Sequence, residues 1–262
     1  MSSKHAKRRH QGQPPPRSRS QAAAAQREAS PRVLIAAAVV LAILIVAGFA
    51  AFKLTSGSDA KPPPPGVALP GAADVERMLK GIPQSGNVLG SPAAPATLVE
   101  YVDLQCPYCQ QFETQVMPNV IDKYVRTGKL KVDIRVLAFI GPDSQRGQSA
   151  AIAAGAQGKE FNFAQLLYAN QSGENTGWLS EDMVSAAAAS IPGLDVEQLQ
   201  SDRDSSAVTA AAKRYVSQAT ADHVTGTPTL LVGPTGSTLK TVSLQSPTDE
   251  QTLTDAIGAA LG

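Results

Sequence analysis

A stretch of residues typical of a β-strand ends three residues before the first of two cysteines, and two residues separate these cysteines from each other. The stretch is ATLVEYVD, residues 96–103, and the pair is Cys106 and Cys109 in the sequence CPYC. No other cysteine occurs in the 262 residues of the chain. The apolar run predicts a buried strand, and Pro107 suits the first turn of a following helix. We therefore expect the pair at the junction of a strand and a helix.

Spacing alone leaves three interpretations of the pair open. A structural disulfide across so short a loop would remove little entropy from the unfolded chain. A structural zinc site needs about four ligands, and His223 is the only histidine after residue 10. The third interpretation is a redox-active dithiol. At a helix N-terminus, free N–H groups and the helix dipole stabilise a thiolate at Cys106, and Cys109 lies one turn on as the resolving cysteine. We favour the dithiol, and we expect no metal and no organic cofactor.

The N-terminal part of the chain predicts a membrane anchor. Residues 1–32 hold eight basic residues and one acid, a net charge of +7, so the chain total of +1 leaves −6 for the remainder. Residues 33–52 are uncharged and almost wholly apolar, which is long enough to span a bilayer. We predict a disordered cytoplasmic head at 1–32 and one transmembrane helix at 33–54. The basic head then sets topology and contacts anionic lipid, with no role in nucleic-acid binding.

A proline-rich stretch separates this segment from a globular domain. Residues 55–71 include four consecutive prolines, which favour an extended linker. The domain is predicted at 72–262, with strands at 96–103, 130–139, 227–233 and 238–244. The helix after the cysteines is expected to continue to about residue 127 with a kink at Pro118, and a closing helix is expected with Ser246 as its N-cap. An alanine-rich helical insertion is expected at about 144–222. This order predicts an α/β fold with a mixed sheet and helices on its faces.

The motifs carry a resemblance to a known family. CPYC after an apolar strand, with GTPT at 226–229, resembles the thioredoxin superfamily. The segment GNVLGSPAAPATLVEYVDLQCPYCQQFE, residues 86–113, is similar to the start of the DsbA-like branch of thiol:disulfide oxidoreductases. The large helical insertion also belongs to that branch. The resemblance covers about residues 85–262 and implies a thioredoxin-like sheet.

Further site residues follow from this resemblance. It implies that Pro228 is a cis-proline packed against the cysteine pair, and that Thr227 offers its backbone to a bound substrate chain. It also implies that Glu100 is a buried acid beneath Cys109 that accepts the proton of that thiol. Asp103 is the competing acid, interpreted as a loop residue near the site.

Two positions depart from the family pattern. Gln105 stands where many members have an aromatic residue, and Tyr108, with Pro107, lies between the cysteines where strong oxidants carry histidine. These departures leave the reduction potential open. In the helical insertion, five large side chains are interpreted as core: Phe161, Phe163, Leu166, Leu167 and Tyr168.

The resemblance implies an oxidoreductase that introduces disulfides into secreted or envelope proteins through a mixed disulfide. Its domain would face away from the cytoplasm on a single-pass anchor at 33–54, as a monomer, and a quinone-linked membrane partner would reoxidise it. Two alternatives stay open. One is a disulfide reductase or isomerase, which moves electrons differently. The other is a non-enzymatic envelope chaperone or binding module whose CPYC is vestigial.

Overall fold

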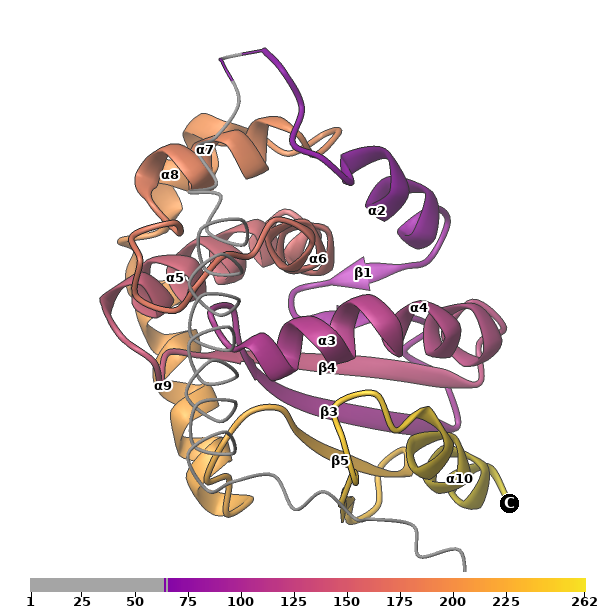
Figure 1. The fold of residues 1–262 in the computed structure, drawn as a ribbon. Coiled ribbons are helices and arrows are strands. Elements are labelled where there is room, and N and C mark those ends of the chain that lie inside the picture. The colour runs from indigo at the N-terminus through magenta and orange to yellow at the C-terminus, as the bar shows by residue number, and fades with distance from the viewer. Residues whose placement is uncertain (1–63, 65) are drawn as a thin grey trace, which may run out of the picture. The chain divides into compact units, whose positions relative to one another are not determined.

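The computed structural model describes residue 64 and residues 66–262, and the predicted head and anchor lie outside this part of the chain. Its sheet has six strands in the order β1-β2-β4-β3-β5-β6 (Figure 1). The strands are β1 (Gln84–Ser85), β2 (Val88–Leu89), β3 (Ala96–Asp103), β4 (Leu130–Leu137), β5 (Thr229–Pro234) and β6 (Lys240–Val242). β3 runs parallel to β4 and antiparallel to β5, so the sheet is mixed as expected.

The predicted elements are present with shifted ends. The helices are α2 (Ala72–Leu79), α3 (Pro107–Gln115), α4 (Met117–Val120), α5 (Pro142–Ala156), α6 (Glu160–Ala169), α7 (Glu181–Ala189), α8 (Val196–Asp202), α9 (Ser206–Ala221) and α10 (Glu250–Leu261), with a π-helical turn, η1, at Ile121–Val125. The expected long helix after the cysteines is divided at Val116, just before Pro118. The short β1–β2 hairpin was not predicted, because two-residue strands carry no periodic signal.

The prediction that Ser246 caps the closing helix is wrong. α10 begins at Glu250, and its N-cap is Asp249, whose carboxylate accepts a hydrogen bond from the Thr252 N–H at 3.2 Å. The other carboxylate oxygen of Asp249 accepts from the Gln245 N–H at 3.0 Å. Both bonds favour a turn before Asp249 over an earlier helix start.

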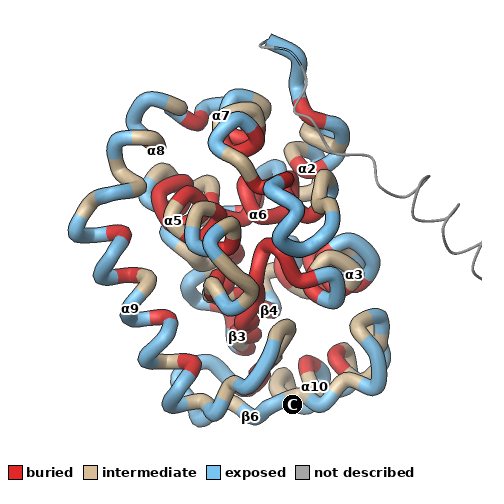
Figure 2. The backbone as a smooth tube through the Cα atoms, turned by 60° about the vertical axis from the view of Figure 1, so that its left-hand side comes forward, coloured by how far each residue is buried: buried red, intermediate tan, exposed pale blue. Residues whose placement is uncertain are grey.

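Helices cover both faces of the central sheet. Asn119, on α4, donates to Glu250 of α10 at 2.9 Å, so these two helices are neighbours. α5 and α9 pack against β4, with α6 between α5 and α3. The buried residues concentrate on β3, β4, α5 and α6, as Figure 2 shows in red. The five large side chains that were interpreted as core in the insertion are all fully buried, which confirms that interpretation.

The packed domain extends back to Leu69. This side chain is buried, and its N–H donates to the Ser190 hydroxyl at 2.8 Å. The Pro70 carbonyl accepts from the Asn170 amide at 2.9 Å. Within the described residues, no helix combines the length and the apolar character that a bilayer crossing needs.

Candidate active site

The two cysteines lie where β3 gives way to α3. Cys106 is the N-cap of α3 and Pro107 is its first residue, a position where the missing N–H of proline costs nothing. The Cys109 N–H donates to the Cys106 Sγ at 3.4 Å. Both side chains are free thiols here, with Cys106 5% exposed and Cys109 fully buried. Of the two cysteines, only Cys106 therefore has any surface that an incoming chain could reach.

The surroundings of the two thiols shift their pKa values in opposite directions. The pKa of Cys106 is lowered to about 6, chiefly by the hydrogen bond from the Cys109 side chain. Hydrogen bonds from the Thr227 side chain and from the N–H groups of Cys109 and Tyr108 also lower it, and together these bonds outweigh the effect of burial. Burial raises the pKa of Cys109 well above its ordinary value. At neutral pH, Cys106 is therefore largely a thiolate and Cys109 a neutral thiol.

This difference predicts the pH dependence of alkylation in the reduced protein. The rate of iodoacetamide reaction at Cys106 should rise with a midpoint near pH 6, because only the thiolate reacts. A free cysteine would show its midpoint at about pH 8.5. Stopped-flow alkylation across pH 4–10, with mass spectrometry to identify the modified residue, measures this. A midpoint at the ordinary value would contradict the stabilised thiolate.

The loop before β5 faces Cys106 from the other end of the sequence. The Thr227–Pro228 peptide bond is cis, and the Cys106 thiol donates to the Thr227 carbonyl at 3.3 Å. The structure thus brings Thr227 and the cysteine pair together across 121 residues of sequence. Tyr108 is 58% exposed beside them, and Phe139, after β4, is 51% exposed.

Glu100 is fully buried on β3, and sequence reasoning missed its neighbour Glu113. Burial, then the charge of Glu113, raise the pKa of Glu100 well above its ordinary value. Burial also raises the pKa of Glu113 to about 8, although the amide of Gln165 donates to it. Neither oxygen of Glu100 has a hydrogen-bond partner among the described residues. Glu113 follows Cys109 by four residues, the spacing of one helix face, which is the signal that could have revealed it.

The strand predicted at 96–103 includes Asp103, as the structure shows, and the separate interpretation of Asp103 as a loop residue is wrong. Asp103 is the last residue of β3, and its buried carboxylate accepts four hydrogen bonds. The Gln105 N–H (2.9 Å) and the Ser144 hydroxyl (2.7 Å) donate to one oxygen, and the N–H groups of Phe139 (2.7 Å) and Ile140 (3.1 Å) donate to the other. Asp103 therefore ties the segment before Cys106 to the segment after β4.

The helical insertion holds the chain just before the cysteines. The Gln105 side chain donates to the Ser144 hydroxyl at 2.9 Å and accepts from the Asn175 N–H at 2.8 Å. Gln171 donates to the carbonyl of Leu104 at 2.8 Å and to that of Cys106 at 3.2 Å. Sequence reasoning did not find these contacts, because each partner is at least 39 residues away.

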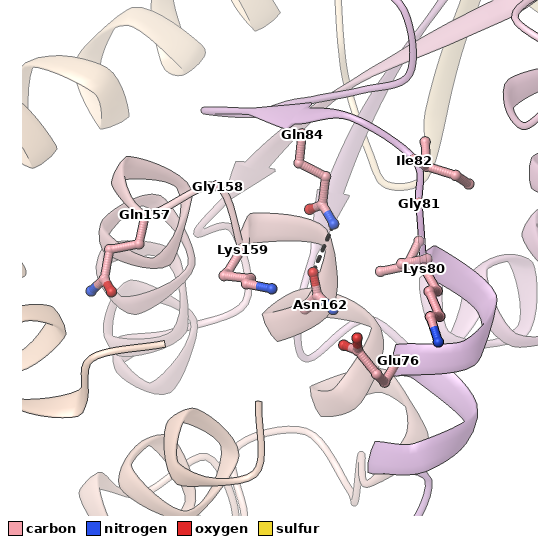
Figure 3. Close-up of a pocket in the computed structure, with 10 residues that line it drawn as sticks. Glu76, Lys80, Gly81, Ile82, Gln84, Gln157, Gly158, Lys159 and Asn162 are labelled. Atoms are coloured by element: carbon pink, nitrogen blue, oxygen red, sulfur yellow. Dashed lines mark hydrogen bonds between the residues drawn. The ribbon is translucent and has the colours of Figure 1, made fainter. Parts of the chain in front are cut away.

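A hollow lies away from the cysteines, between α2 and the start of α6 (Figure 3). Its volume is about 270 Å³. Lys80, Lys159 and Glu76 line it, and the Gln84 amide donates to Asn162 at 2.7 Å within it. Neither cysteine lines this hollow. No group of three or more His, Cys, Asp or Glu side chains in the described residues is arranged to hold a metal ion.

Comparison with known proteins decides the family. A family model described as Thioredoxin matches residues 84–244, which is more than half of the chain. The chain belongs to this thioredoxin family. It is 31% identical over 147 residues to a probable disulfide bond formation protein D of Bacillus cereus, covering 55% of this chain and 68% of that protein.

Solved structures agree with this thioredoxin assignment. A thioredoxin-like oxidoreductase from Silicibacter pomeroyi superposes with a TM-score of 0.54 at 29% identity, covering 70% of this chain and 95% of that one. Oxidised BdbD from Bacillus subtilis superposes with a TM-score of 0.59 at 20% identity, covering 68% and 96%. Within the thioredoxin superfamily, the chain is a thiol:disulfide oxidoreductase of the DsbA-like branch.

Proposed function

We propose that this oxidoreductase introduces disulfides into secreted or envelope proteins through Cys106. One observation carries the proposal: the Cys106 thiol caps α3 with a lowered pKa while the Cys109 thiol is buried with a raised one. A stabilised thiolate makes the reduced enzyme the favoured state, so its disulfide tends to accept electrons from a client. The name of the Bacillus relative, a disulfide bond formation protein, supports the same direction.

The proposed reaction has two exchange steps. A client thiolate attacks Sγ of Cys106 in the oxidised pair, which forms a mixed disulfide and expels Cys109 as a thiolate that takes up a proton. A second client thiolate then attacks the client sulfur of the mixed disulfide and expels Cys106 as a stabilised thiolate. The client is oxidised by two electrons and the enzyme is reduced. A membrane protein that passes these electrons to quinone is the proposed reoxidant, and this step rests on the family resemblance alone.

The surroundings of Cys106 suit an extended client chain. Thr227 precedes the cis-proline Pro228, and its backbone is proposed to pair with the client as an added strand would. The exposed rings of Tyr108 and Phe139 are proposed to contact apolar client side chains on either side of the reacting cysteine. Pro107 and Tyr108, between the cysteines, set the surroundings of the thiolate.

Glu100, together with Glu113, is proposed to exchange a proton with Cys109. The raised pKa of both carboxyls means that the pair binds a proton closer to neutral pH than ordinary carboxyls do. Such a pair can give a proton to the Cys109 thiolate when it is expelled, directly or through one water, and can take it back on reoxidation.

Glu100→Gln is expected to slow the attack of Cys109 on a Cys106–glutathione mixed disulfide by about tenfold or more, because the amide cannot accept the proton. Rapid-quench measurement of glutathione release gives this rate. Glu113→Gln is the matched variant, and a slowing there alone would assign the role to Glu113. Wild-type rates in both variants would contradict a role for the pair.

The domain is proposed to act outside the cytoplasm, anchored by residues 33–54 and acting as a monomer. This placement rests on the basic residues 1–32, the apolar run that follows them and the proline-rich linker. Disulfides persist in such an oxidising space, which suits a dithiol enzyme. No metal or organic cofactor is needed for the proposed chemistry.

The reduction potential distinguishes this oxidase from its alternatives. Equilibration with glutathione buffers is expected to give a value less negative than about −200 mV, because the Cys106 thiolate stabilises the reduced form. A value near that of thioredoxin, about −270 mV, would instead support a reductase. Client processing that survives Cys106→Ser would support a chaperone or binding module.

A further inference from the structure

A partly buried hydrogen-bond network lies on the face of the sheet opposite α3. Successive strand residues point to opposite faces, so Tyr101 points away from the side of Glu100. The Tyr101 hydroxyl donates to Asp222 Oδ2 at 2.6 Å and accepts a hydrogen bond from Arg135. The Tyr101 side chain is completely buried.

Arg135 connects Tyr101 to the rest of the sheet. It lies directly opposite Tyr101 in the pairing of β4 with β3. Its Nη2 donates to one carboxylate oxygen of Asp133 at 2.8 Å and its Nε to the other at 3.2 Å. The Asn87 amide, next to β2, donates to the same carboxylate. The network thus extends from β2 through β4 and β3 to Asp222, and rigid strands hold every member except Asn87 and Asp222.

The Asp222 carboxylate bonds to Tyr101 and Arg135 and to no group of its own helix. Asp222 is the C-cap of α9, where the helix dipole disfavours a negative charge. After it, His223 adopts a left-handed backbone with φ of 55°, a conformation usually left to glycine at this position. The Val224 N–H donates to the Ala219 carbonyl at 2.8 Å across this turn. Asp222 is therefore unfavourable for its own helix end and precedes a residue with a left-handed backbone. We infer that its structural role is the bond to Tyr101.

Tyr101 is joined to both ends of the loop that faces the cysteines. Asp222 bonds to its hydroxyl just before residues 223–228, and Thr229 is its partner in the pairing of β3 with β5, just after them. Between these two ties, the Thr227 carbonyl accepts from the Cys106 thiol at 3.3 Å. Tyr101 therefore contacts both ends of the segment that carries the cis-proline, and Arg135 Nη1 adds a direct ion pair to Asp222 Oδ2 at 3.5 Å.

We propose that Tyr101, with Arg135 and Asp222, is a positioning group that holds the Thr227–Pro228 loop against Cys106 and thereby sets the reactivity of that thiol. Tyr101 touches no substrate and acts through Thr227. The inference rests on the proposed role of Cys106 as the reacting sulfur. Its chemical consequence is felt at the sulfur, since the Thr227 side chain favours the Cys106 thiolate whereas the Thr227 carbonyl accepts from the thiol at 3.3 Å and favours the protonated form.

Tyr101→Phe removes one hydroxyl and keeps the buried ring. We expect the alkylation midpoint of Cys106 to shift by about half a pH unit or more, because the loop end is released and the contacts of Thr227 with the sulfur weaken. Asp222→Asn, at a partly exposed helix end, should move the midpoint in the same direction and serves if Tyr101→Phe does not fold. Tyr124→Phe is the matched control, since Tyr124 lies on η1, apart from this loop. The Cys106 midpoint in this variant should equal that of wild type.

Thermal unfolding of the same variants distinguishes positioning from support of the fold alone. A lower melting temperature with an unchanged Cys106 midpoint in both Tyr101→Phe and Asp222→Asn would overturn the proposal. Iodoacetamide alkylation needs no client protein, so this result is independent of the proposed function. If the midpoint shifts as expected but no client is ever oxidised, the positioning network stands and the proposed function fails.

Discussion

Asp103→Ala is expected to lower the free energy of unfolding by about 3–5 kcal/mol, among the largest effects of any single substitution in the described domain. The carboxylate accepts from Gln105, Phe139, Ile140 and Ser144, and all four donors would lose their partner on one change. A buried donor left without a partner costs about 1–3 kcal/mol, and these costs add only in part. Urea unfolding of the reduced protein measures the difference.

Two comparisons make the Asp103 result specific. Asp103→Asn keeps the size and one acceptor oxygen, so its loss of stability should lie between alanine and wild type. Asp195→Ala removes an exposed N-cap that accepts one bond, from Gln198 at 2.9 Å, and should cost only about 1 kcal/mol. If Asp103→Ala matched Asp195→Ala, the four-bond interpretation of this carboxylate would be wrong.

The strand–cysteine–helix junction could be predicted because its signals are local. The apolar run ends at Asp103, three residues before Cys106, and Pro107 suits a helix start, so neighbours in sequence settle the geometry. The expectation of a cis-proline at Pro228 came from the resemblance and agrees with the structure. The alternating pattern of β4 was equally plain, although the strand ends at Leu137, two residues earlier than predicted.

The roles of polar side chains could not be predicted, because their partners lie far away in sequence. Asp103 was interpreted as a loop acid because three of its four donors, Phe139, Ile140 and Ser144, come from two segments distant in sequence. The Tyr101–Asp222 bond spans 121 residues, and no periodicity indicates it. Glu113 is the exception, since its spacing from Cys109 places both on one helix face. The anchor predicted at 33–54 lies outside the described residues and stays a prediction.

Capture of client proteins by Cys109→Ala shows whether Cys106 forms mixed disulfides with secreted or envelope proteins. Without Cys109 the mixed disulfide at Cys106 cannot be resolved by the enzyme, so it should accumulate as a species that disappears on reduction. Cys109 is fully buried, so alanine removes the resolving sulfur without exposing a new surface. The experiment uses the full chain in growing cells, with free thiols blocked by acid and alkylation before non-reducing electrophoresis.

The control is the double variant Cys106→Ser with Cys109→Ala, which keeps the fold and the client surface but lacks the reacting sulfur. We expect several trapped clients in the single variant, all secreted or envelope proteins that contain cysteine, and none in the double variant. The absence of trapped proteins in the single variant, equal capture by both variants, or clients that are cytoplasmic proteins would contradict the proposed role of Cys106.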